Sequence, residues 1–114
     1  SGPILGAQHR APEFDPEVEI LSPASNNVVL KSPFDLRLRF KTYNGTRLDT
    51  ASIKVLYLRN PQADLTPRVV KHLKGNMIEM SGAEAPPGQH EIRIEFKDSR
   101  NHVGSATLTL NVMK

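Results

Sequence analysis

The sequence predicts an all-β fold in which two sheets face each other across one core. Several segments alternate apolar and polar residues, most clearly residues 34–41, and such alternation buries one face of a strand and exposes the other. Clusters of Pro, Gly and Asn separate these segments and mark turns. Only one segment has helical spacing. We therefore expect about seven short strands and one short helix, and half-buried strands that share a core pack as two layers.

Residues 1–16 differ from the rest of the chain. They contain three prolines and two glycines and show no apolar period, and proline favours an extended backbone. We expect an extended arm or linker, not all of it necessarily native, followed by one sandwich domain over residues 17–114. A chain of 114 residues suits a single domain with a single core.

The domain is expected to begin with a strand that is broken and then resumed. Residues 18–23 form a short strand that Pro23 ends. The next turn contains Asn26 and Asn27, since Asn tolerates the left-handed conformation. Residues 28–30 continue as a second short piece, and an interrupted strand of this kind is typical of a sheet edge.

Two longer strands follow. In residues 34–41 the apolar side chains share one face, and after a loop with a turn at Asn44-Gly45 residues 52–59 form the next strand. The second of these strands has apolar side chains on both faces. Leu56 and Leu58 lie on its outer face, so a further element is expected to cover them.

Residues 67–74 are the predicted helix that provides this cover. Thr66 is a good N-cap, Pro67 suits the first helical position, and Gly75 suits the position after the last turn. An apolar stripe at helical spacing is formed by Val69, Val70 and Leu73. A helix of two turns is marginal alone, so it is expected to pack on Leu56 and Leu58.

The last part of the chain predicts a short strand over residues 76–81 and then a hairpin. Residues 90–98 and 103–112 both alternate, and the five residues between their apolar stretches make a turn. In that turn Asp98 is expected to accept backbone N–H groups, and Asn101 is expected to take the left-handed conformation. The sum of these strands indicates a β-sandwich of immunoglobulin-like type.

Three stretches resemble the bacterial immunoglobulin-like domains of secreted and cell-envelope proteins. They are "ILSPASNNVV", "PPGQHEIRIEFKD" and "DSRNHVGSATLTLNV", and the resemblance extends from Val18 to Val112. Asn101 stands where that family usually has Gly. The resemblance implies an extracytoplasmic location and a spacer, adhesion or docking role, and it implies no catalytic residues.

Composition and motifs argue against several functions. The 15 basic and 12 acidic residues are scattered, and no aromatic residues interleave with the basic ones, so nucleic acid is not expected as a partner. The chain has no cysteine and no apolar run long enough for a membrane helix. It also lacks a nucleophile elbow and a phosphate-binding loop. We therefore expect a protein that is not an enzyme and needs no cofactor.

Metal binding and sugar binding are the weaker alternatives. The four histidines, His9, His72, His90 and His102, show no ligand spacing. Periplasmic copper carriers resemble this sequence in their opening strand, but they place a histidine at the mature N-terminus, where this chain has Ser1. A polysaccharide-binding module usually presents exposed aromatic rings, and Tyr43 is the one expected to be exposed.

The leading hypothesis is therefore a non-catalytic immunoglobulin-like module of a bacterial extracytoplasmic protein. It would serve structural spacing or protein docking, with flanking domains of the same polypeptide among its partners. The loops over residues 42–51, 60–66 and 81–89 are the expected contact regions. The expected contact residues are Tyr43, Arg100 and His102. The alternatives are a small periplasmic ligand or copper carrier and a polysaccharide-binding module.

Overall fold

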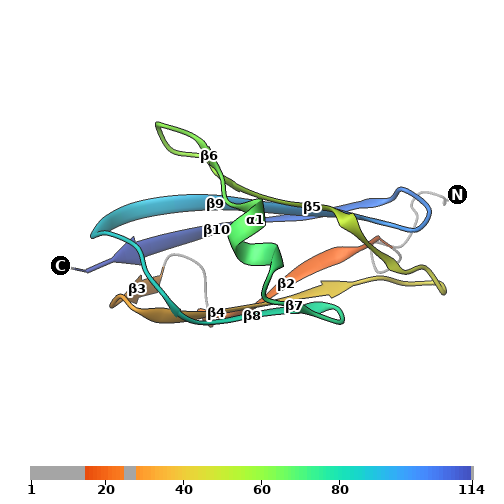
Figure 1. Ribbon diagram of the computed structural model, residues 1–114, viewed down its shortest axis with the longest axis horizontal. Helices are drawn as coiled ribbons and strands as arrows, with labels where there is room; N and C mark the ends of the chain where they lie inside the picture. The colour runs from red at the N-terminus through yellow and green to blue at the C-terminus, as the bar shows by residue number, and fades with distance from the viewer. Residues whose placement is uncertain (1–14, 25–27, 114) are drawn as a thin grey trace, which may run out of the picture.

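The computed structural model describes residues 15–24 and 28–113, which form a sandwich of two sheets (Figure 1). One sheet has the order β2-β4-β8-β7 and the other β3-β10-β9-β5-β6. This confirms the predicted all-β, immunoglobulin-like sandwich; the described residues add two strands of only two residues each to the seven expected. The strands are β2 (Glu17–Ser22), β3 (Val28–Leu30), β4 (Phe34–Lys41), β5 (Leu48–Tyr57), β6 (Ala63–Asp64), β7 (Leu73–Lys74), β8 (Met77–Ala83), β9 (Gly88–Asp98) and β10 (Val103–Val112).

The core lies between the two sheets and is built from the faces that the alternation predicts. In β4 every second side chain is buried or half-buried, and the same holds for the inward faces of β9 and β10. Phe40 of β4 packs edge-on against Phe96 of β9, with ring centroids 5.1 Å apart and an interplanar angle of 69°. The buried apolar side chains of these three strands are Leu36, Leu38, Phe40, Ile94, Phe96, Leu108, Leu110 and Val112.

The first strand changes sheets at the break. β2 pairs antiparallel with β4, whereas β3 pairs parallel with β10 in the other sheet. Both pieces lie at a sheet edge, as predicted. The predicted turn at Asn26 and Asn27 lies outside the described residues, as do residues 1–14 of the predicted arm.

The helix is shorter than predicted. α1 spans Thr66–Val70, and its N-cap is Leu65 rather than Thr66. The Thr66 hydroxyl is already engaged, because the Val55 N–H donates to its Oγ1 at 2.9 Å. The predicted last turn is instead the strand β7, which pairs with β8. Gly75, with φ +59°, serves the turn between these two strands rather than a helix end.

The predicted cover of the outer face of β5 is also wrong. α1 lies at the open edge of the sandwich, between β5 and the β7–β8 hairpin (Figure 1). Its buried residue Val69 belongs to the core between the sheets. Leu56 and Leu58 instead line a small hollow of about 200 Å³ beside the segment that leads into β6.

The connections are shorter than the predicted loops over 42–51, 60–66 and 81–89. The structure leaves only residues 42–47, 58–62 and 84–87 between the flanking strands. Sequence patterns missed the start of β5 because this strand carries a register shift between Asp49 and Lys54. A bulge of this kind interrupts the alternation on which strand prediction depends.

Gly104 occupies a site that has no space for a side chain. A Cβ there would lie 2.7 Å from the Pro16 carbonyl oxygen and 2.8 Å from Cε1 of Phe96. The glycine therefore allows the chain just before β2 to pass directly over β10.

In the described part of the chain, we find no helix with the length and apolar character that crossing a membrane requires.

Candidate functional site

The predicted contact residues gather at one end of the sandwich. Tyr43 lies in the β4–β5 connection, and Arg100 and His102 lie in the β9–β10 turn. The two segments are joined directly, since the Arg47 N–H donates to Ser99 Oγ at 3.0 Å. Tyr43 is half-buried rather than exposed, and its hydroxyl donates to Glu17 Oε2 at 3.3 Å.

Asp98 organises the β9–β10 turn. Its Oδ1 accepts the N–H groups of Arg100 and His102 at 2.8 and 2.9 Å, and its Oδ2 is 2.9 Å from Nδ1 of His102. The carboxylate is only 2% exposed. Burial alone would raise the pKa of Asp98, but the hydrogen bonds from His102 and Arg100 outweigh it, so the pKa lies below its usual value. His102 is thus held by the turn, and the Arg100 side chain is exposed at its tip.

Replacing Asn101 with Gly should leave stability unchanged or raise it by up to about 1 kcal/mol. Asn101 has φ +67°, a conformation that glycine adopts without steric cost. Thermal unfolding followed by circular dichroism measures the effect. Asn76→Gly is the matched control, because Asn76 lies in a turn but is not among the residues of positive φ. This variant should lose about 0.4–1 kcal/mol, since glycine gives the unfolded chain more conformational freedom. A clear loss of stability in Asn101→Gly would show that its side chain holds the turn.

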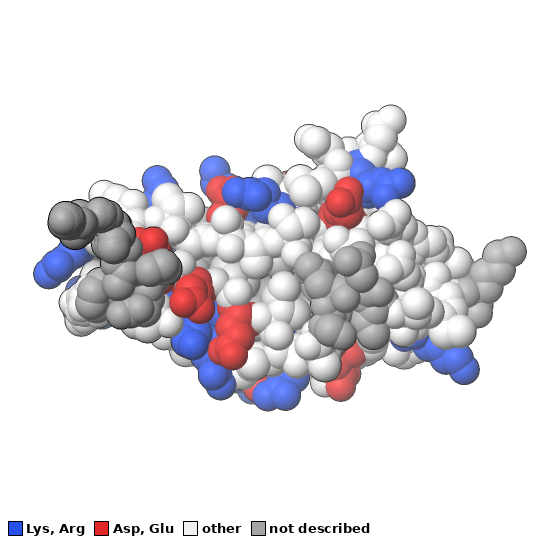
Figure 2. Space-filling view, turned by 180° about the vertical axis from the view of Figure 1, so that it is seen from behind, with Lys and Arg blue, Asp and Glu red and all other residues white. Residues whose placement is uncertain are grey.

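The basic side chains form two ordinary charged surfaces rather than one stripe. Those of β4 and those of β9 belong to different sheets. Several pair with a neighbouring carboxylate: Arg37 with Glu79 at 3.7 Å, Arg39 with Glu19 at 3.2 Å and Arg93 with Glu95 at 2.8 Å. On the face shown in Figure 2, acidic and basic side chains lie beside one another.

The histidines of the described residues do not form a metal site. No group of three or more His, Asp or Glu side chains that suits a metal ion occurs within residues 15–24 and 28–113. His72, His90 and His102 lie at separate places in the fold. His9 lies outside the described residues.

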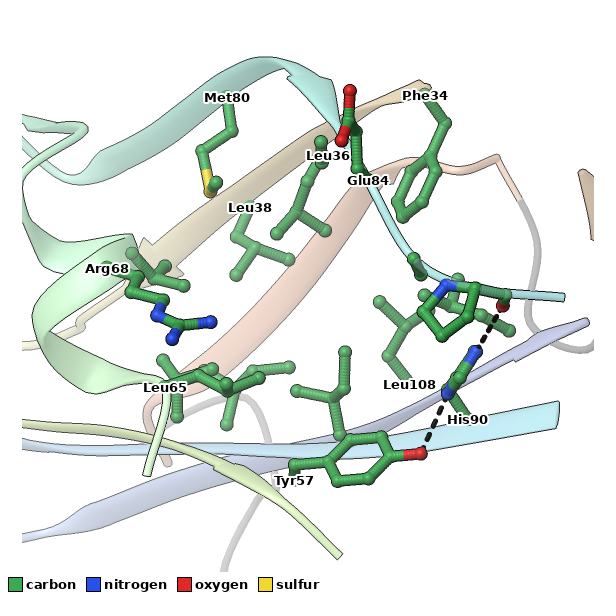
Figure 3. Close-up of a pocket in the computed structure, with 18 residues that line it drawn as sticks. Phe34, Leu36, Leu38, Tyr57, Leu65, Arg68, Met80, Glu84, His90 and Leu108 are labelled. Carbon is green, nitrogen blue, oxygen red and sulfur yellow. Dashed lines mark hydrogen bonds between the residues drawn. The ribbon is translucent and has the colours of Figure 1, made fainter. Parts of the chain in front are cut away.

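The described residues enclose a cavity of about 380 Å³ inside the sandwich (Figure 3). It lies between the sheets and is bordered by α1 on one side and by the β8–β9 connection on the other. Its walls are almost entirely apolar. They are formed by Phe34, Leu36, Leu38, Val55, Leu65, Val69, Met80, Ala83, Ala85, Ile92, Ile94, Leu108 and Leu110.

A hydrogen-bonded chain holds one wall of this cavity. His90 Nε2 lies 2.7 Å from the Pro86 carbonyl oxygen, and His90 Nδ1 lies 2.8 Å from the Tyr57 hydroxyl. A carbonyl only accepts, so Nε2 carries a proton and donates to it, while Nδ1 makes the second hydrogen bond with the Tyr57 hydroxyl. Both ring nitrogens are therefore engaged, and the chain ties the β8–β9 connection to β5.

Two charged side chains also line the cavity, one at each of these borders. Arg68 of α1 and Glu84 of the β8–β9 connection line it, and both are exposed. Arg68 directs its guanidinium towards the cavity, whereas the Glu84 carboxylate points away from it (Figure 3). The described part of the chain shows no hydrogen bond or ion pair to the Arg68 side chain.

Sequence reasoning did not find this site. It assigned most of the wall residues to the core, which is where they lie, but alternation does not reveal whether a core is filled. The signals that were present are His90 and Tyr57, two polar residues at inward positions of apolar strands. Buried polar side chains need hydrogen-bond partners, and here Tyr57 and His90 bond to each other.

Comparisons with known proteins bear on the fold. No family model matches this sequence, and no curated protein matches it. The chain is similar to a solved structure, the crystal structure of CopC from Methylosinus trichosporium OB3b. The TM-score is 0.52 at 15% sequence identity, over 85% of this chain and 94% of CopC. The two share a β-sandwich fold. At this identity the likeness says nothing about the site.

Proposed function

We propose that this chain is a non-catalytic, extracytoplasmic β-sandwich domain that binds a small apolar ligand between its sheets. The observation that carries the proposal is the cavity of about 380 Å³ with apolar walls. Pockets of about 300–1,000 Å³ with apolar walls and a few placed polar groups are typical ligand sites. The extracytoplasmic part rests on the turn motifs that resemble secreted and cell-envelope domains.

The cavity differs from ordinary packing between sheets. Protein interiors are packed about as densely as organic crystals, and voids larger than a water molecule are few. An apolar hollow this large holds water poorly, because its walls offer few hydrogen bonds. A ligand with an apolar body would remove these walls from water, and this is the driving force for binding.

Calorimetric titration with 1-decanol, below the concentration at which it separates from water, tests this function. We expect saturable binding of one molecule per chain and shifts of the Ile92 and Leu108 methyl signals in NMR spectra. Ala85→Phe should abolish binding, because Ala85 lines the cavity and is half-buried. Ala51→Phe, the same change at an exposed residue, should bind normally. Absence of binding to the unmodified chain, or binding that Ala85→Phe leaves intact, would refute the function.

Protein docking at the end of the sandwich is the second candidate. It is favoured by the bond from Arg47 to Ser99, which fixes the β4–β5 connection against the β9–β10 turn and so presents a rigid surface. In this case a folded Tyr43→Ala/Arg100→Ala double variant should lose a partner that the cavity variant Ala85→Phe keeps. Cross-linking in the native host, followed by mass spectrometry, distinguishes the two variants.

A further inference from the structure

We propose that the ligand is a free fatty acid of about ten carbons whose carboxylate pairs with Arg68. This inference rests on the proposed function and names the class of ligand. Three features carry it: the apolar walls, the single cation directed into the cavity, and the cavity's size.

The walls exclude a ligand with many polar groups. The side chains inside the cavity that can hydrogen-bond are Tyr57 and His90. These two bond to each other, and His90 also bonds to the Pro86 carbonyl. A sugar or peptide would bring buried polar groups that find no partners, and each such group costs binding free energy. A hydrocarbon chain meets no such penalty.

Arg68 decides the charge of the head group. Its guanidinium points towards the cavity and is not paired with another side chain of the described residues. Among the described residues Glu84 is the only one with a carboxylate that lines the cavity, and this carboxylate points away (Figure 3). A carboxylate matches the planar guanidinium with two parallel hydrogen bonds. An anionic head is therefore favoured over a cationic one.

The size of the cavity sets the chain length. A heavy atom with its hydrogens fills roughly the volume of one water in the liquid, about 30 Å³. The cavity of about 380 Å³ therefore holds about a dozen heavy atoms. Decanoate has that size, with its carboxylate at Arg68 and its chain between the sheets.

Calorimetry with decanoate, 1-decanol and decyltrimethylammonium tests the head group, each below its micelle concentration. Decanoate should bind the unmodified chain about tenfold more tightly than decanol, which corresponds to one charge-assisted hydrogen-bonded pair. Arg68→Gln should remove this tenfold advantage and leave the affinity for decanol unchanged. Lys71→Gln, which removes a positive charge from the exposed residue after α1, should leave decanoate binding unchanged.

A series of saturated fatty acids of increasing length tests the length of the ligand's hydrocarbon chain. Affinity should rise about fourfold with each added methylene, the value expected for its burial, and should stop rising near ten carbons. These results together support the proposal. A rise that continues well past twelve carbons would overturn the assigned length, because the chain would not end inside the cavity.

Three other outcomes would contradict the assigned head group but not the proposed function, and a fourth would contradict the function. If decanol and decanoate bind equally and Arg68→Gln changes neither affinity, the cavity binds apolar ligands without selecting them by charge. If decyltrimethylammonium binds best, Glu84 rather than Arg68 selects the ligand. If Lys71→Gln weakens decanoate as much as Arg68→Gln, the attraction is general and not a pair. If none of the three probes binds, the proposed function itself fails.

Discussion

Phe40→Asp is expected to abolish cooperative folding. Phe40 is 0% exposed, and its ring packs edge-on against Phe96 across the core. Loss of a buried aromatic side chain alone costs about 3–5 kcal/mol. The substitution also buries a carboxylate without a partner, which adds several kcal/mol. Together these losses approach or exceed the free energy of unfolding of a typical domain, which is about 5–15 kcal/mol.

Phe40 is a sharper choice for this test than Leu38. Both are fully buried in β4, but Leu38 lines the cavity that opens to solvent. A substitution there would therefore change the cavity wall as well as bury a charge. A substitution at Phe40 buries a charge only, since Phe40 is not part of the cavity wall.

Urea unfolding followed by circular dichroism measures the result. Arg37→Asp is the control, because it introduces the same residue on the exposed face of the same strand. It should remain folded and lose at most about 1 kcal/mol. Phe40→Leu should also fold, with a loss of about 1–2 kcal/mol. A cooperative transition of unchanged midpoint in Phe40→Asp would mean that the inward face of β4 is assigned wrongly.

The strands were predictable because their signal is local. The side chains of a strand alternate between two faces whatever the strand pairs with, so β4, β9 and β10 show their buried faces directly in the sequence. The β9–β10 turn was predictable for the same reason. Asp98 and Asn101 act on backbone groups within five residues of themselves.

The helix was predicted too long because its signals have a second use. A Thr can cap a helix or accept a hydrogen bond from another strand. Here the Thr66 hydroxyl accepts a hydrogen bond from the Val55 N–H. A glycine of positive φ can end a helix or turn a hairpin, and Gly75 does the latter. Sequence position alone does not decide between these uses. Partners far along the chain decide, in this case β5 and β8.

The cavity was not predictable, although the residues around it were. Alternation shows that a Leu or Ile faces inward. It does not show whether that side chain contacts the opposite sheet or is separated from it by a cavity. The volume depends on how α1 and the β8–β9 connection hold the sheets apart at one edge. That arrangement follows from the short helix and from the His90–Pro86 hydrogen bond, neither of which the strand pattern indicates.

Asp98→Ala is expected to lower the free energy of unfolding by about 2–4 kcal/mol at pH 7. The carboxylate accepts two backbone N–H groups and faces the His102 ring while remaining almost inaccessible to water. Each buried donor left without an acceptor costs about 1–3 kcal/mol. The hairpin that Asp98 closes contains the longest ladder of paired residues in the five-stranded sheet, so the loss should affect global unfolding.

Asp98 should also make stability depend on pH. Its pKa in the folded chain lies below its usual value, about 3.9 in an unfolded chain. A group with a depressed folded pKa contributes stability that is fully present above the unfolded pKa and is lost as the pH falls through the folded one. The contribution of Asp98 should thus be complete above about pH 5 and should disappear in stronger acid.

Urea unfolding of Asp98→Asn at several pH values between 7 and 2 isolates this contribution. Asn keeps an oxygen that accepts the N–H groups but has no proton to gain, so its stability should fall less steeply below pH 5 than that of the unmodified chain. Asp64 also has a lowered pKa, through hydrogen bonds from Thr66, and is present in both proteins, so it cancels in the comparison. Asp35→Asn, at an exposed residue of β4, should keep the steep dependence. If Asp98→Asn and the unmodified chain lose stability in parallel, the His102 and backbone bonds to Asp98 do not hold its charge in the folded state.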